Sequence, residues 1–228
     1  MITASVGILV VLLLWGTLVG IDLVSVPQGL LARPLIAATV AGWLLGDLHT
    51  GIRVGALLEL FALDVLPVGA SRYPEYGPAS VGAVLLAVGL DRPGGIGAGV
   101  LLGLLLALLA GYTLEWLRHA NARDVHRTED ELNAGSVAAI RRLQWAGITR
   151  DLVRSAGVTA GALLLATVGI ARIGEAASLP AALTPALVGV GVAAALSGAV
   201  RNAGRGRRLL WLGIGLAAGL ALVLGGVA

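Results

Sequence analysis

Residues 33–80 read RPLIAATVAGWLLGDLHTGIRVGALLELFALDVLPVGASRYPEYGPAS. The stretch is apolar enough for a lipid bilayer, yet it also carries the charged side chains Asp47, Arg53, Glu59 and Asp64. An ionised side chain near the middle of a bilayer costs at least about 3 kcal/mol on insertion scales, so it persists where it faces a partner, a watery cavity or a substrate. The stretch therefore predicts a pathway for a polar solute.

The composition is that of a membrane protein. Hydrophobic residues occupy 57% of the 228 positions and charged residues 13%, whereas roughly a quarter of the residues in a soluble domain are charged. The chain is too short for a membrane unit plus a soluble domain of usual size. We therefore expect residues 1–228 to form a single membrane domain, an all-α polytopic helical bundle.

The basic residues indicate how the chain lies in the membrane. They are all arginines, and most of them fall in two segments, 118–154 and 201–208. The positive-inside rule places both segments on the cytoplasmic side, so this charge indicates topology and not nucleic-acid binding. We expect 118–154 to form a cytoplasmic loop, within which 136–150 has the pattern of an interfacial helix.

The apolar run at 34–46 is too short to cross a bilayer, because a spanning helix needs about 20 residues. GDLHTG follows at once, where Gly46 and Asp47 can end one helix and Thr50 can cap the next. This pattern predicts a re-entrant, broken-helix hairpin near residues 34–66. Because non-helical backbone at membrane depth is tolerated only within protein or beside a cavity, the turn at 46–51 and the non-helical break from Pro67 to Pro78 should face an interior space.

Two acidic residues of the hairpin are candidate substrate contacts. Glu59 lies mid-helix in GALLELFAL with apolar neighbours on every side, so it needs an interior partner. The alternative is a structural ion pair with Arg53 or Arg33, and the two roles can coexist. Asp47 is a second candidate, with capping or pinning of the turn as the alternative.

Three further candidates flank the hairpin. Glu75 stands between tyrosines and prolines in SRYPEYGPAS, residues 71–80. Aromatic rings can cover the C–H face of a sugar while fixed acceptors bind its hydroxyl groups, and an ordinary surface loop is the alternative. Asp22 and Gln28, in IDLVSVPQGLLARP, are similar, with helix termination around Pro27 as the alternative.

The sequence predicts no catalytic group, metal or cofactor. It has no HExxH, no paired aspartates at helical spacing and no serine with a plausible base. His49, His119 and His126 lack the spacing of metal ligands, and the absence of cysteine excludes thiolate sites. GGIGAGVLLG at 94–103 is typical of close helix packing, because no strand precedes it.

The chain resembles the IIC, or permease, component of the mannose, fructose and sorbose family of the bacterial sugar phosphotransferase system. The resemblance is carried by RPLIA at 33–37, GxxLGDxxTGIxxGxxLEL at 42–60, PVGA at 67–70, GIGAG at 95–99 and RHANA at 118–122. It implies that Gly46, Asp47, Thr50 and Gly51 correspond to the family's turn and that Glu59 corresponds to its acid.

The resemblance implies a multi-pass sugar permease subunit of the bacterial inner membrane. Such a subunit works in an oligomeric complex with a second membrane subunit, IID, and with soluble IIA and IIB phosphocarrier proteins. Phosphoryl transfer would then lie on the partners, and this subunit would be non-catalytic. The alternative is a regulatory or sensory membrane subunit that has kept the fold and lost transport, because Arg72, Tyr73 and Tyr76 depart from the residues of familiar sugar-specific members.

Overall fold

The computed structural model describes residues 5–65, 72–175 and 179–203, together with 210, 213–215 and 217. In these residues every regular element is helical: α1 (Val6–Asp22), α2 (Pro34–Leu44), α3 (Leu48–Ala62), α4 (Tyr76–Leu90), α5 (Gly95–Arg127), α6 (Glu129–Asn133), α7 (Val137–Glu175) and α8 (Leu183–Ala203). The all-α class predicted from composition is confirmed. The apolar stretch at 209–227 lies largely outside the described residues.

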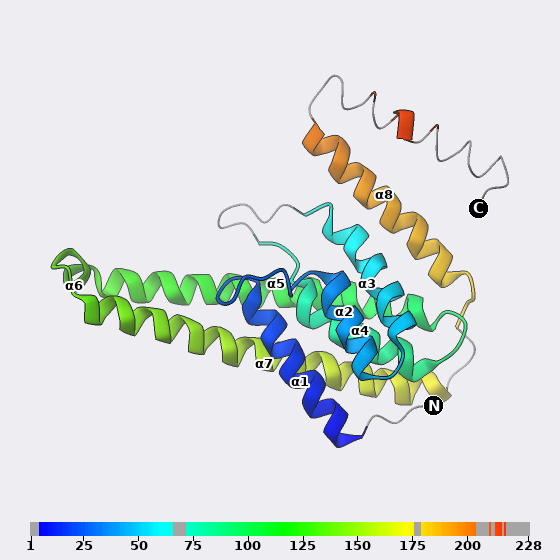
Figure 1. Cartoon of the computed structure of the whole chain (residues 1–228), viewed down its shortest axis with the longest axis horizontal. Coiled ribbons are helices and arrows are strands. Elements are labelled where there is room, and N and C mark those ends of the chain that lie inside the picture. The colour runs from blue at the N-terminus through cyan, green and yellow to red at the C-terminus, as the bar shows by residue number, and fades with distance from the viewer. Residues whose placement is uncertain are drawn as a thin grey trace.

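The core forms around α4, which lies between α2, α5 and α7 (Figure 1). Every α4 residue from Gly77 to Leu90 is buried. Small residues allow the neighbouring helices to approach closely: a Cβ at Gly103 would lie 3.0 Å from that of Ala83, and one at Gly82 would lie 2.9 Å from Ala162. A uniformly apolar helix of this kind is suited to the interior of a bundle.

The α2–α3 hairpin forms as predicted, with its turn at Leu45–Asp47. Gly42 and Gly51 are opposed, and a Cβ on Gly51 would lie 2.7 Å from the carbonyl oxygen of Ala38. The backbone N–H of Thr50 donates to the Asp47 carboxylate at 2.9 Å, so Asp47 is the N-cap of α3. The expectation that Thr50 itself caps α3 was therefore wrong.

The arginine-rich segment 118–154 differs from the expected loop. Residues 118–127 extend α5, residues 137–154 begin α7, and the short α6 joins them in a helical hairpin that projects from the bundle (Figure 1). The expected interfacial helix at 136–150 is continuous with the rest of α7. Pairs across the hairpin explain the difference, since Arg150 contacts Asp124 at 2.5 Å and so ties its two helices together.

Two of the helices are long and apolar enough to cross a membrane, among the residues described: α5 and the Val137–Gly174 part of α7. α1, α2, α4 and the first part of α8 are shorter apolar helices. α1 crosses α7, where the Ser155 hydroxyl donates to the carbonyl of Thr17 at 2.9 Å. The two long helices thus provide the frame against which the shorter elements pack.

Candidate substrate cavity

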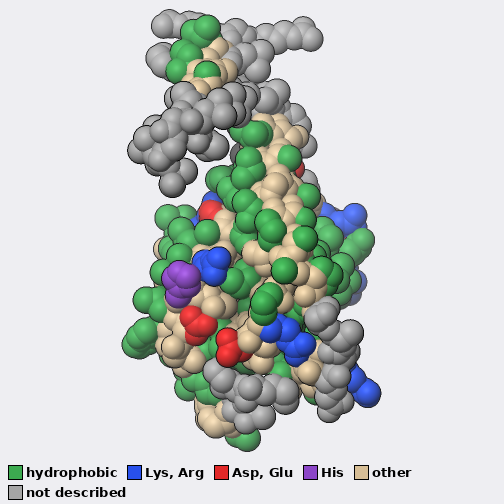
Figure 2. All heavy atoms as spheres, turned by 90° about the vertical axis from the view of Figure 1, so that its right-hand side faces the viewer, with side chains coloured by type: hydrophobic (Ala, Val, Ile, Leu, Met, Phe, Trp, Pro, Cys, Tyr) green, Lys and Arg blue, Asp and Glu red, His purple; other side chains and the backbone are tan. Residues whose placement is uncertain are grey.

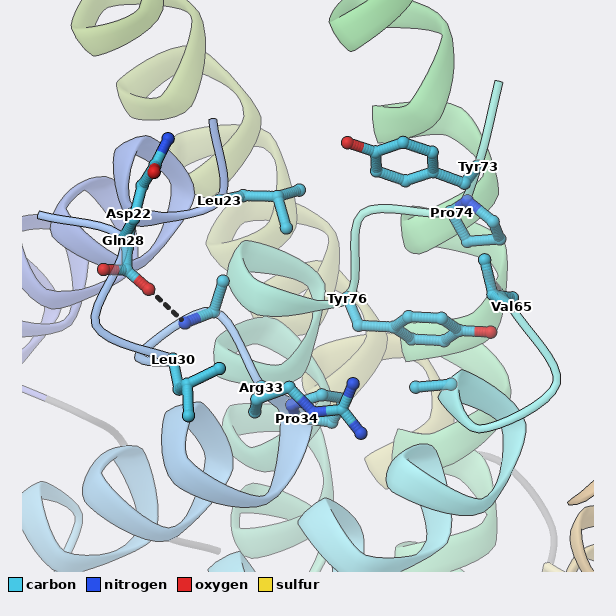
Figure 3. A pocket seen from close by; sticks show the side chains of 12 residues that line it. Asp22, Leu23, Gln28, Leu30, Arg33, Pro34, Val65, Tyr73, Pro74 and Tyr76 are labelled. Atoms are coloured by element: carbon cyan, nitrogen blue, oxygen red, sulfur yellow. Dashed lines mark hydrogen bonds between the residues drawn. The ribbon is translucent and has the colours of Figure 1, made fainter. Parts of the chain in front are cut away.

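A cavity of about 340 Å³ opens between the α1–α2 connection and the segment that precedes α4 (Figure 3). The first wall comes from Asp22, Leu23, Gln28, Leu30, Ala32 and the start of α2. The second comes from Tyr73, Pro74 and Tyr76, and the end of α3 closes the space through Ala62 and Val65. The cavity therefore lies where the broken elements of the fold meet.

Asp22 shapes the first wall. Its side chain is nearly buried, at 2% exposure, and its two carboxylate oxygens accept the backbone N–H groups of Gly29 at 2.6 Å and Ala32 at 3.0 Å. These bonds fold the connection back over the end of α1. Gln28 stands in this fold with a positive φ of 60° and donates its amide to the carbonyl of Val24 at 3.2 Å. Asp22 therefore holds the loop that presents Gln28.

Tyr73 and Tyr76 form the opposite wall. In Figure 3 the ring of Tyr73 extends across the opening toward Leu23, and the ring of Tyr76 lies toward the segment that carries Val65. The Arg118 guanidinium lies over the Tyr73 ring, 4.6 Å from its centroid, which is a favourable cation–π geometry. This contact orients an aromatic face beside the cavity.

The segment bearing these tyrosines rests on α5. The backbone N–H of Glu75 donates to the carbonyl of Ala107 at 2.9 Å. Gly111 permits the contact, because a Cβ there would lie 2.6 Å from the carbonyl oxygen of Tyr73. The non-helical segment expected before α4 is thus present at 72–75, while residues 66–71, including Pro67, lie outside the described residues.

Glu59 makes the ion pair that the sequence left open. Its carboxylate binds the Arg33 guanidinium and also accepts the backbone N–H of Leu35 at 3.2 Å. It therefore caps the first turn of α2, whose N-terminal N–H groups have no partner within the helix. Arg33 lines the cavity, whereas Glu59 lies behind it.

Glu75 is completely buried and joins an ionic cluster that sequence reasoning missed. Arg154 of α7 contacts its two oxygens at 2.5 and 3.0 Å. The same guanidinium binds Asp151, one turn earlier on α7, at 2.8 Å, and the Thr113 hydroxyl of α5 at 3.1 Å. The hydroxyl of Ser25 donates to Asp151 at 2.5 Å. The cluster thus ties both cavity walls to α7.

The remaining candidate, Asp47, lies at the far end of the hairpin with Gly46, Thr50 and Gly51. The cavity therefore brings together Asp22 and Gln28, holds Glu75 buried beside it and Glu59 behind Arg33, and leaves Asp47 apart. Within the described residues no group of three or more His, Asp or Glu side chains is placed to hold a metal ion.

A family model described as the phosphotransferase system sorbose-specific IIC component matches residues 6–160. The chain belongs to this IIC family. The match covers more than half of the sequence and confirms the resemblance carried by the hairpin motifs. Membership also identifies the chain as an integral membrane protein.

Relatives of this IIC chain include the fructose permease IIC component of Bacillus subtilis strain 168, which is 30% identical over 165 residues, 72% of this chain and 59% of the relative. The mannose-specific EIIC component of Escherichia coli K12 is 30% identical over 142 residues, 62% and 52% respectively. A sorbose-specific EIIC component of Klebsiella pneumoniae is 52% identical over 58 residues, 25% of this chain and 22% of the relative. The chain spans little more than half the length of the first two relatives.

Solved structures share the fold of this IIC chain. A membrane-protein structure aligns with a TM-score of 0.75 at 21% identity, over 99% of this chain and 92% of its own. A cryo-EM structure of the mannose transporter ManYZ in complex with microcin E492 aligns with a TM-score of 0.62 at 23% identity, over 99% and 94%. The fold therefore extends over nearly the whole sequence.

Proposed function

We propose that this IIC chain is a permease subunit of a mannose-family phosphotransferase system and that it translocates a sugar which partner subunits phosphorylate. Family membership supports the system, and the cavity between Gln28 and the two tyrosines supports the substrate class. No observation on the described residues favours the regulatory alternative.

The chemistry of the cavity is the observation that carries the proposal. The charged groups on its wall have protein partners: Arg33 is paired with Glu59, and Asp22 accepts two backbone N–H groups. The polar groups that remain for a ligand include the amide oxygen of Gln28, whose nitrogen donates to Val24, and the hydroxyls of Tyr73 and Tyr76. Neutral hydrogen-bonding groups beside aromatic rings suit an uncharged, hydroxyl-rich molecule.

The proposal includes the setting of the transporter. The chain would work in the bacterial inner membrane, in an oligomeric complex with a IID membrane subunit. Soluble IIA and IIB proteins would supply the phosphoryl groups for the transported sugar. The α5–α7 hairpin, with its arginines at 118–154, would lie on the cytoplasmic side, in agreement with the positive-inside rule. Asp22, Gln28, Glu59 and Glu75 would form or support the sugar site, and Asp47 would hold the hairpin turn.

Uptake of a panel of radiolabelled hexoses and amino sugars tests the proposal in cells that express this chain with its neighbouring subunits. Gln28→Ala and Tyr76→Phe should raise the KM for the transported sugar at equal membrane abundance, because each removes a hydrogen-bonding group from the cavity. Tyr112→Phe is the matched control, since Tyr112 is exposed on α5 and does not line the cavity. Absence of uptake of any sugar by a correctly assembled complex would contradict the proposal.

A further inference from the structure

A second cavity, of about 430 Å³, lies at the other end of the α2–α3 hairpin from the substrate cavity. Three elements meet there: the first half of α3 through Arg53, the α4–α5 turn through Arg92, Pro93 and Gly94, and the start of α8 through Thr184. Figure 2 looks onto this end of the molecule, where basic, acidic and histidine side chains stand among hydrophobic ones. The two cavities share no lining residue.

The charge of this second cavity is entirely positive. Arg53 and Arg92 line it, and no acidic side chain does. Arg53 is exposed and makes no hydrogen bond or ion pair with any residue of the described chain. Arg92 donates to the carbonyls of Leu90 at 3.4 Å and Gly174 at 3.1 Å, which orient its guanidinium without neutralising it.

The backbone around the cavity adds to this positive character. α5 and α8 both begin at its wall, and the N-terminus of a helix carries a partial positive charge. The N-cap of α5 is Gly94, which offers no side-chain acceptor. The Thr184 hydroxyl accepts the N–H of Gly97 at 3.1 Å, so the first turn of α8 is fixed to that of α5.

We infer that this second cavity binds an oxyanion of the phosphate type, held between Arg53 and Arg92. A guanidinium presents paired N–H donors that match two oxygens of a phosphate. Both guanidinium groups line one cavity that has no acidic lining residue, so a bound oxyanion would neutralise positive charge that the lining leaves uncompensated. The anion has two possible sources, the headgroup of an anionic phospholipid and a free phosphate in solution.

The test uses the purified full-length chain with its partner subunits in neutral detergent, titrated separately with phosphatidylglycerol, phosphatidylcholine and inorganic phosphate. The readouts are the number of bound lipids by native mass spectrometry and the rise in Tm that a ligand of the native state produces. Retention of phosphatidylglycerol but not phosphatidylcholine identifies a lipid source. A rise in Tm with inorganic phosphate identifies a free anion.

The variants separate this site from general surface charge. Arg53→Gln with Arg92→Gln should weaken binding of the effective ligand by roughly tenfold or more, because charge-assisted hydrogen bonds are lost. Arg172→Gln is the matched control. Arg172 is exposed near the C-terminal end of α7, close to Gly174, which contacts Arg92, and it does not line the cavity. Arg53→Gln alone breaks no hydrogen bond or ion pair with a described residue, so it should weaken binding without unfolding the protein. Equal affinity of the wild type and the arginine variants, or no binding of either ligand, would overturn the inference.

Discussion

At Arg154 one guanidinium faces two buried carboxylates, Glu75 at 2.5 Å and Asp151 at 2.8 Å. All three side chains are at most 3% exposed. Removal of one member of such a group leaves charge buried without compensation, which is far more costly than losing an ion pair at the surface. The cluster therefore positions the cavity walls, because it couples Glu75, which lies next to the tyrosines of one wall, through Asp151 to Ser25 in the α1–α2 connection that forms the other.

Arg154→Gln is expected to lower the free energy of unfolding by about 3–5 kcal/mol, because two carboxylates would remain buried together. Arg150→Gln is the comparison, since this arginine is more exposed and its pair with Asp124 contributes about 1 kcal/mol or less. Thermal unfolding of both variants in detergent measures the difference. A loss of stability in Arg154→Gln no larger than that in Arg150→Gln would show that the cluster does not hold the fold together.

Asp47→Ala separates the two roles considered for this residue. As the N-cap of α3, Asp47 contributes about 0.5–2 kcal/mol to stability, and it does not line the cavity. The variant should therefore lower the Tm while the KM for the transported sugar stays unchanged. Asp47→Ser keeps a capping oxygen and should recover most of the lost stability. A raised KM in Asp47→Ser at normal Tm would instead assign Asp47 to the substrate.

At the scale of elements, the α2–α3 hairpin is the part of the fold that short-range sequence signals determine. Its turn at Gly46 and Asp47 lies within a short local pattern, so spacing could predict where the two helices meet, and it offered both Asp47 and Thr50 as the cap, of which the structure has Asp47. The Arg33 partner of Glu59 was also among the sequence alternatives, because only two arginines lay nearby. The two helices of the hairpin are in close backbone contact at Gly42 and Gly51, so a side chain introduced at either glycine should disrupt their packing.

Gly51→Ala is expected to destabilise the protein by about 1–3 kcal/mol, because the new methyl group would meet the backbone of α2. Gly161→Ala on α7 is the matched control. A Cβ at Gly161 meets nothing within 4 Å, and alanine is a better helix former than glycine, so this variant should be neutral or stabilising. Denaturation of the two variants side by side measures the contrast, and equal effects would contradict the close packing of the hairpin.

At the scale of the whole molecule, sequence analysis predicted the class and family but not the ionic cluster or the projecting hairpin. Arg154 meets Glu75 across 79 positions of sequence, a separation that no local pattern reveals. The many arginines at 118–154 predicted a polar loop outside the membrane. Hydropathy shows which residues can lie in lipid, but it does not show whether a helix continues beyond the lipid, as α5 and α7 do. RDLVR, with opposite charges three residues apart at the edge of an apolar run, was the available signal for a partly buried pair.

The sides of the membrane on which the α5–α7 hairpin and the start of α8 lie can be measured directly. The chain has no cysteine, so a single introduced cysteine is the only residue that a maleimide labels. Ala134→Cys, at the tip of the α5–α7 hairpin, should react with a membrane-impermeant maleimide only after the inner membrane is opened. Ala182→Cys, before α8 at the opposite end, should react in cells whose inner membrane is intact. The reverse pattern of labelling would invert the topology that the arginines predict.

The continuity of α7 has a mechanical consequence. Arg142 near the projecting tip and Arg154 beside the cavity belong to one uninterrupted helix, and at 1.5 Å per residue they lie about 18 Å apart along its axis. No break in the helix lies between these two arginines, so a displacement at one is transmitted to the other. A protein that binds the tip and tilts it would therefore also displace Arg154. Through its ion pair, Arg154 would pass that displacement to Glu75, which lies beside the cavity.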